Sequence, residues 1–168
     1  MAFKRLDRDE LRRILILNWM THDGLWFNEV ATKFGMGEAS PMNLSVCRKL
    51  GAIEVSRLMK MTGASSPRDM AEYRELFEFA AEAFVPDFQT IRVDYPGGDI
   101  QVFHMLECFA HKALKSAGRL ADYECGIFER IEGWFDAMHL KYVRTPDLSR
   151  CLKSRGEECV ITVKFSFE

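Results

Sequence analysis

Four cysteines in the C-terminal half of the chain are the residues best suited to do chemistry. They follow the spacing C-x16-C-x25-C-x7-C, at Cys108, Cys125, Cys151 and Cys159. Zinc prefers four tetrahedral thiolate or imidazole ligands, because soft sulfur suits the ion and four ligands complete its shell. The other interpretation is four small buried hydrophobic residues, since free cysteine is among the most buried residue types. Spacing alone supports the two interpretations about equally.

A second candidate set lies near the N-terminus. Trp19, His22 and Trp26 are spaced i, i+3, i+7 and therefore share one helix face, with Asp23 beside them. Such a set could line a pocket for a flat organic ligand. The pattern alone favours a core helix with a hydrogen-bonded histidine. Whether the protein is an enzyme stays open; if it is, His22 and Asp23 are the pair that we consider for general base and orienting carboxylate.

Two weaker candidates for catalytic residues are better explained by structural roles. Glu129, Glu132 and Asp136 recur at i, i+3, i+7, where paired carboxylates could do acid–base work, but we expect a solvated helix face. Cys47 lies on the apolar side of a predicted helix, which indicates a buried structural thiol rather than a nucleophile.

The chain up to residue 86 is predicted to be helical. One helix begins at a capping box of Asp7 and Glu10 and ends at Gly35. Two further helices, over 40–63 and 66–86, each begin at a Ser-Pro pair, which is a cap followed by proline at the first helical position.

After residue 86 the hydrophobic period changes from helical to alternating. A hairpin is expected over 90–106, with Ile100, Val102 and His104 on one face of its second strand. Two helices follow, and a second hairpin is expected over 141–152 and 158–167. The last strand alternates most clearly, with Cys159, Ile161, Val163, Phe165 and Phe167 on one face.

The predicted fold class is therefore α+β, with N-terminal helices followed by ββααββ and an antiparallel sheet covered by helices. We divide the chain into a helical part, 1–86, and a zinc-binding α+β part, 87–168, which together form one compact unit.

Composition narrows the possible partners. The 168 residues are 48% hydrophobic and 29% charged, with a formal net charge of -2 and no basic run, so neither nucleic acid nor a membrane is expected as a partner. No apolar run reaches the length of a transmembrane helix, and the charged start lacks the apolar core of a secretory signal, so we expect a cytoplasmic protein. The expected partner is a small organic ligand, and the chain could form a homodimer.

The stretch from Cys125 to Phe165 resembles the 4-vinyl-reductase-like small-molecule-binding domains, and especially the sensor domains of phenol-responsive bacterial transcription regulators. It shares with them a Gly133-Trp134 pair on a helix, a Cys-x25-Cys interval and a Cys-x7-Cys hairpin with Gly156 in its turn. This resemblance implies an α+β domain that binds zinc beside a small-molecule pocket.

The same resemblance implies Cys125, Cys151 and Cys159 as zinc ligands, together with a glutamate three residues before the second of them. Here that position is Leu148, which cannot bind a metal. We therefore choose Cys108 as the fourth ligand, because it completes a closed structural site; an open position would indicate a catalytic metal. The substitutes for Cys108 are His104, His111 and Asp147.

The strings WMTHDGLWF and FGMGEA near the N-terminus resemble an uncharacterised bacterial and archaeal family. That family is distantly similar to L-2-amino-thiazoline-4-carboxylate hydrolases, whose name describes the opening of a small sulfur heterocycle.

Our first hypothesis is a small-molecule binding or sensor module with a structural zinc site. Its pocket, for an apolar or aromatic molecule, would draw on Trp19, His22, Trp26, Phe103, His104 and Trp134. The alternative is a metal-dependent hydrolase of a small heterocycle such as a thiazoline carboxylate. A third possibility is a scaffold subunit of a larger assembly.

Overall fold

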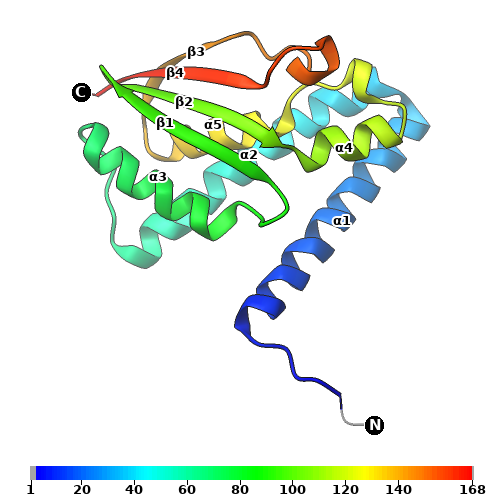
Figure 1. The fold of residues 1–168 in the computed structure, drawn as a ribbon, viewed down its shortest axis with the longest axis horizontal. Coiled ribbons are helices and arrows are strands. Elements are labelled where there is room, and N and C mark those ends of the chain that lie inside the picture. The colour runs from blue at the N-terminus through cyan, green and yellow to red at the C-terminus, as the bar shows by residue number, and fades with distance from the viewer. Residues whose placement is uncertain (1–2, 168) are drawn as a thin grey trace.

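The computed structural model of the protein describes residues 3–167 (Figure 1). Three helices come first: α1 (Arg8–Phe34), α2 (Met36–Thr62) and α3 (Met70–Phe84). They are followed by strands β1 (Thr90–Gly97) and β2 (Ile100–Glu107), helices α4 (Phe109–Ser116) and α5 (Gly126–Ala137), and strands β3 (Lys141–Thr145) and β4 (Val160–Ser166). The α+β fold class and the element order ββααββ are confirmed.

Local capping explains where the N-terminal helices begin. The capping box of Asp7 and Glu10 starts α1, as the sequence predicts. The other two starts differ from the prediction. Helix α2 begins at Met36, about a turn earlier, so that Pro41 lies inside it. Helix α3 begins after Asp69, whose carboxylate accepts the backbone N–H groups of Ala71 and Glu72 and displaces the Ser-Pro pair as the cap.

The four strands form one antiparallel sheet in the order β1-β2-β4-β3. On β4 the predicted alternation is confirmed, with Ile161, Val163 and Phe165 buried. On β2, Ile100, Val102 and His104 share one face, as expected, but it is the other face of the strand that is buried. Phe103 and Met105 point into the core, and between them His104 points to the other face.

The buried face of β2 includes a glutamine. Gln101 is fully buried. Its side-chain oxygen accepts a hydrogen bond from the hydroxyl of Tyr73, and its side-chain nitrogen donates one to the hydroxyl of Tyr95 over 3.2 Å. A polar residue with its hydrogen bonds satisfied can thus occupy a core position that a hydrophobic pattern assigns to solvent.

The hydrophobic core lies between the sheet and helices α3 and α5, and α2 packs on α5 (Figure 1). Trp134 and Phe135 of α5 are almost completely buried there, beside Phe165 of β4 and Phe77 of α3. The buried indole of Trp134 donates to the Glu54 carboxylate over 3.1 Å, and Arg130 pairs with the same carboxylate over 2.8 Å.

Two glycines let α2 and α5 approach closely. A Cβ atom on Gly51 would lie 1.9 Å from the backbone oxygen of Arg130, and one on Gly133 would lie 2.2 Å from the backbone oxygen of Arg48. No side chain fits at such distances, so the crossing of these two helices requires glycine on both sides.

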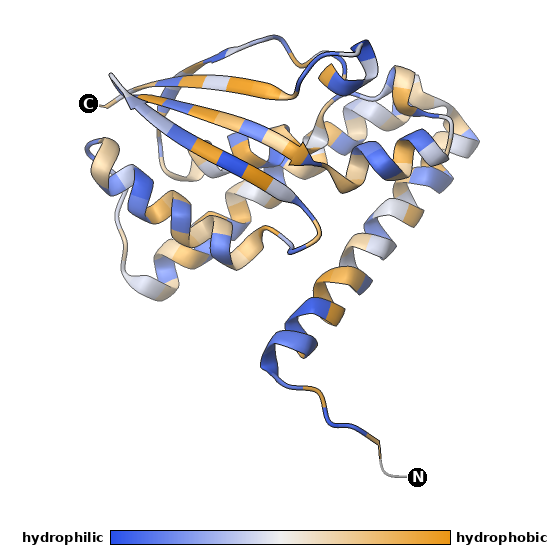
Figure 2. Cartoon of the chain, viewed as in Figure 1, coloured by the Kyte–Doolittle hydropathy of each residue, from blue (hydrophilic) through white to orange (hydrophobic). Residues whose placement is uncertain are grey.

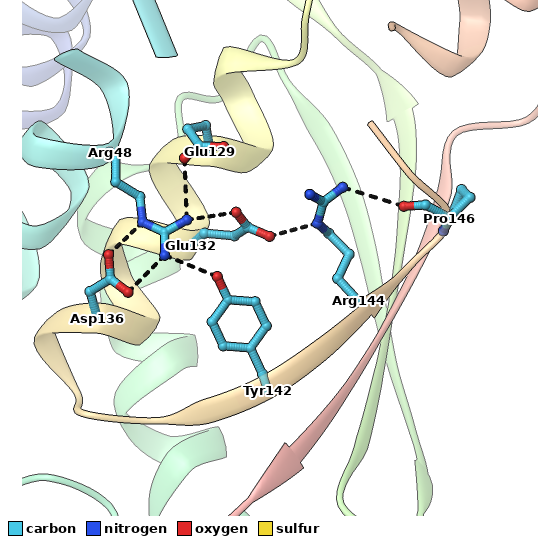
Figure 3. A network of polar contacts seen from close by, with 7 residues as sticks. All are labelled: Arg48, Glu129, Glu132, Asp136, Tyr142, Arg144 and Pro146. Atoms are coloured by element: carbon cyan, nitrogen blue, oxygen red, sulfur yellow. Dashed lines mark hydrogen bonds and ion pairs between the residues drawn. The ribbon is translucent and has the colours of Figure 1, made fainter. Parts of the chain in front are cut away.

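A polar network joins the same helices to β3 (Figure 3). The guanidinium of Arg48 on α2 donates to Glu132 over 2.7 Å, to Tyr142 over 3.0 Å and to both oxygens of Asp136. Arg144 on β3 reaches the other oxygen of Glu132 over 2.6 Å. The expected solvated face of acidic residues is therefore wrong, because these carboxylates hold α2, α5 and β3 together.

The segment before β4 also departs from the prediction. Strand β3 ends at Thr145, and a short 3-10 helix over Leu152–Arg155 occupies most of the expected turn. Cys151 therefore caps this 3-10 helix instead of lying on a strand opposite Cys159. Among the described residues, no helix is both long and apolar enough to cross a membrane.

Candidate functional site

The four C-terminal cysteines line one small cavity of about 30 Å³. Each comes from the end of a different element. Cys108 caps α4, Cys125 caps α5, Cys151 caps the 3-10 helix, and Cys159 directly precedes β4. Segments that are far apart in the sequence thus bring their sulfur atoms to the same space.

Backbone hydrogen bonds fix these four segments relative to one another. The N–H group of Cys151 donates to the carbonyl of Tyr123 over 3.0 Å, and the carbonyl of Cys159 accepts the N–H group of Met105 over 2.9 Å. The Cys108 sulfur accepts the N–H group of His111 over 3.5 Å. The positions of the thiols are therefore set by the fold.

Burial keeps three of these thiols, Cys108, Cys125 and Cys159, protonated at neutral pH. It raises the pKa of Cys125 well above its ordinary value and that of Cys159 to about 11. It also raises the pKa of Cys108, although backbone N–H groups at the start of α4 oppose the effect. Negative charge on Cys159, Cys108 or Cys151 would raise the pKa of Cys125 further, so the four sulfurs lie within electrostatic reach of one another.

Four thiols are a suitable set of ligands for zinc, but in this structure they do not form a group that could bind a metal ion. Within residues 3–167, no three His, Cys, Asp or Glu side chains form a group that could hold a metal ion as they stand. Four thiols around one small apolar cavity nevertheless match the ligand preference of zinc. Zinc binding would deprotonate the thiols and draw them closer together.

The substitutes for the fourth ligand occupy different places. His111 lines the cavity, and burial together with Lys153 and Lys115 lowers its pKa. His104 lies on the other face of the sheet, where its ring pairs with Asp94 over 2.9 Å. Asp147 is not on a strand as expected; it lies in the loop after β3, and a hydrogen bond with Ser149 lowers its pKa. Leu148 lines the cavity as a hydrophobic wall.

A second, larger cavity of about 490 Å³ shares a wall with the thiol cavity. Tyr123 and Ile127 line both spaces. The larger cavity lies between α1, α2, α4 and the start of α5, and most of its lining is apolar. Its hydrophobic walls include Met20, Phe27, Phe88, Phe109, Leu114 and Ile127. We call it the interhelical cavity.

A few polar groups reach into the interhelical cavity. They come from Asp23 and Asn28 on α1 and from Asn43 and Cys47 on α2. Burial raises the pKa of the Asp23 carboxyl, although the positive charge of Arg130 opposes this shift. Burial also raises the pKa of Cys47 to about 12, so this thiol is a weak nucleophile at neutral pH. An apolar cavity with few polar groups is typical of a small-molecule site.

The side chains predicted to form one ligand pocket do not meet around one cavity. Phe103 and Trp134 are buried in the core, and His104 lies on the outer face of the sheet. His22 is exposed, and Trp19 is 38% exposed with its ring 5.2 Å from the guanidinium of Arg130; neither residue lines the interhelical cavity. Trp26 is 68% exposed and borders a separate groove between α1 and α2.

Sequence reasoning missed most of the lining of the interhelical cavity. Phe109, Ala113 and Leu114 lie on one face of α4, and their spacing gives no sign that they face another helix instead of the main core. Asn43 carries the clearest available signal, because it is a polar residue on a helix side between apolar neighbours.

Comparison with known proteins gives a family without a function. The model described as "Family of unknown function (DUF6125)" matches residues 4–153. The match covers most of the chain, so the protein belongs to this family, and the expected membership of an uncharacterised family is confirmed. No curated protein matches the chain.

Proposed function

We propose that the protein is a small-molecule binding or sensor module whose structure is held by zinc at Cys108, Cys125, Cys151 and Cys159. The observation that carries this proposal is the shared wall: four thiols line one cavity, and Tyr123 and Ile127 separate it from a much larger apolar cavity. The resemblance of the segment from Cys125 to Phe165 to 4-vinyl-reductase-like sensor domains supports the same conclusion.

In this proposal zinc has a structural task. When bound, the ion would tie the end of β2, the start of α5, the 3-10 helix and the start of β4 to one point. Two of these segments adjoin the shared wall. Cys125 lies between Tyr123 and Ile127 in the sequence, and the backbone N–H group of Cys151 donates to the carbonyl of Tyr123. Metal binding would thereby hold the wall of the ligand cavity in place.

The ligand is proposed to occupy the interhelical cavity. Aromatic and aliphatic walls suit an apolar or aromatic body, and the carboxyl of Asp23 with the amides of Asn28 and Asn43 suits a hydrogen-bonding head. The cavity volume of about 490 Å³ lies within the range of sites that bind small organic molecules. We expect phenols, aromatic acids or sulfur heterocycles.

Metal analysis tests the zinc part of the proposal. Protein produced with zinc available should hold one zinc per chain, and Cys159→Ser should lose the metal and lower the melting temperature. The matched control is Cys47→Ser, which removes a thiol outside the cluster and should keep the metal. A chelator should destabilise the wild type and leave Cys159→Ser unchanged. Stoichiometric zinc in Cys159→Ser would refute this ligand set.

A screen for ligands tests the cavity. Binding of phenols, aromatic acids and sulfur heterocycles can be followed by thermal shift and intrinsic tryptophan fluorescence. Ala113→Trp places an indole in the interhelical cavity and should abolish binding. Ala71→Trp, at an exposed alanine on α3, should bind normally. Equal binding by both variants would show that the ligand lies elsewhere.

One observation favours the hydrolase as a second candidate. Asp23, named from the sequence as part of a possible acid–base pair with His22, lines the interhelical cavity with a raised pKa, and the two side chains interact electrostatically. A carboxyl of this kind is a candidate general acid or base. Turnover of a thiazoline carboxylate that is lost in Asp23→Asn and His22→Ala, and kept in Cys47→Ala, would favour the enzyme. Binding without turnover would favour the sensor.

A further inference from the structure

Helix α1 exposes a long apolar stripe. Figure 2 shows hydrophobic residues recurring along this helix, which extends away from the rest of the molecule. Ala31 is the only residue of its 27 that is fully buried. The exposed side chains are large: Leu11 47%, Ile14 44%, Leu15 66%, Trp19 38%, Leu25 61% and Trp26 68%. An apolar surface of this extent marks an interaction site.

The spacing of the stripe is that of a helix that pairs with another helix. Leu11, Ile14, Asn18, Thr21 and Leu25 recur at intervals of three and four residues. This is the heptad pattern, in which a single asparagine at a central position fixes register and partner number. The stripe is bounded by contacts with the body of the protein: Arg12 donates to the carbonyl groups of Glu82 and Ala83, Trp19 stacks on Arg130 of α5, and Thr21 and Leu25 border the interhelical cavity.

The stripe adjoins an apolar groove at Trp26. The groove lies between the C-terminal half of α1 and the N-terminal part of α2, and has a volume of about 540 Å³. Met42 and Val46 of α2 line it and are more than half exposed. The N-terminal half of α1 thus presents a projecting apolar ridge, and its C-terminal half borders a groove.

We propose that two copies of the chain associate through α1 as an antiparallel, two-fold symmetric dimer. The axis passes near Asn18, so that Leu11 of each copy lies beside Leu25 and Trp26 of the other. The ridge of each copy then enters the groove of its partner, which makes the interface self-complementary.

The available area is sufficient for a stable dimer. The six stripe residues with Met42 and Val46 present roughly 850 Å² per copy, if a fully exposed large side chain offers roughly 200 Å². A standard protein interface buries about 800 Å² per partner.

Charge favours a second copy over a membrane surface. The first turns of α1 carry both signs, with Asp9 and Glu10 among Arg8, Arg12 and Arg13. A helix that lies on an anionic membrane has a polar face rich in lysine and arginine instead. The mixed charges suit a partner of the same composition.

This dimer would also complete the surroundings of the ligand site. Asp23, Phe27 and Asn43 line both the groove and the interhelical cavity. A helix from the second copy would therefore close the groove next to the cavity. The inference rests on the exposed stripe and stands whether or not the cavity binds a ligand.

The test is the molar mass in solution, measured by light scattering and sedimentation. The wild type should be a dimer. Leu15→Glu and Leu25→Glu should each weaken association by about 100-fold or more. Met61→Glu, at an exposed methionine outside the stripe, should remain a dimer. Circular dichroism should show all variants folded, since Leu15 and Leu25 lie outside the core.

A charge exchange tests the antiparallel arrangement. In the double variant Leu11→Lys with Leu25→Glu, an antiparallel pair places opposite charges together, whereas a parallel pair places like charges together. We expect this variant to dimerise and Leu11→Glu with Leu25→Glu to be monomeric. Monomeric wild type up to roughly 100 µM would overturn the proposal. Wild type that binds anionic vesicles and does not self-associate would also overturn it. A dimeric wild type with a monomeric Leu11→Lys, Leu25→Glu variant would overturn the antiparallel arrangement.

Discussion

The close crossing of α2 and α5 makes a sharp prediction for Gly133→Ala. The added Cβ atom would lie 2.2 Å from the backbone oxygen of Arg48 and 2.9 Å from the backbone nitrogen of Ala52. Both atoms belong to the backbone of α2, so no side-chain rotation relieves the contact. To restore ordinary distances the two helices must separate by roughly 1 Å, which forfeits about a quarter to a half of each van der Waals contact across the crossing.

Two opposing effects set the size of the change. Overpacking of this kind costs about 1–3 kcal/mol and occasionally more, and here the hydrogen bonds of Arg48 and Glu54 across the same crossing also stretch. Alanine in place of glycine returns up to about 1 kcal/mol through helix propensity. We expect a net loss of about 1–3 kcal/mol in the free energy of unfolding, or a melting temperature lower by roughly 2–12 °C.

The assay is urea unfolding followed by circular dichroism, with Gly24→Ala as the matched control. Gly24 lies inside α1 and has no neighbour within 4 Å of an added Cβ atom. Its replacement should stabilise the protein by about 0.5–1 kcal/mol, the ordinary gain for alanine in a helix. If Gly133→Ala also stabilises the protein, the close helix crossing described above is wrong.

Two further predictions concern buried groups of α2. Replacing Glu54 by leucine leaves the buried guanidinium of Arg130 without its carboxylate, so the free energy of unfolding should fall by about 3–5 kcal/mol. The control Glu78→Ala breaks an exposed ion pair and should change the free energy of unfolding by about 0.5 kcal/mol or less. Alkylation of Cys47, followed by peptide mass spectrometry, should accelerate about tenfold per pH unit from pH 7 to 9, since the raised pKa leaves little thiolate there. A rate that levels off within this range would contradict the burial of that thiol.

Features with a local cause could be predicted from the sequence. The start of α1 follows from the side chains of Asp7 and Glu10, and the buried face of β4 follows from strict alternation over seven residues. Convergence of the four cysteines was predicted from a spacing and a resemblance, and the structure brings them to one cavity. The cap of α3 was predicted at Ser66-Pro67 and lies at Asp69, because sequence alone does not rank two neighbouring caps.

Features that depend on distant partners could not be predicted. The acidic residues of α5 look like a solvent-facing stripe until Arg48, more than 80 residues earlier, is placed against them. From the sequence, the apolar stripe of α1 resembles a core face. Hydrophobic periodicity indicates that a helix face is apolar, but it does not indicate what covers that face. The same limit applies to Gln101, whose burial depends on hydroxyl groups from α3 and β1.

The relation between the two cavities bears on which function the zinc would serve. A catalytic metal must present an open position to its substrate, whereas four thiolates would fill the shell of the ion. Here the side chains of Tyr123 and Ile127 stand between the thiols and the space large enough for a substrate. A hydrolase of this architecture would therefore have to work through Asp23, on the α1 side of the interhelical cavity, and not through the metal. From this geometry we expect zinc to stabilise the fold and Asp23→Asn to alter only ligand affinity. These two results together are the behaviour of a sensor.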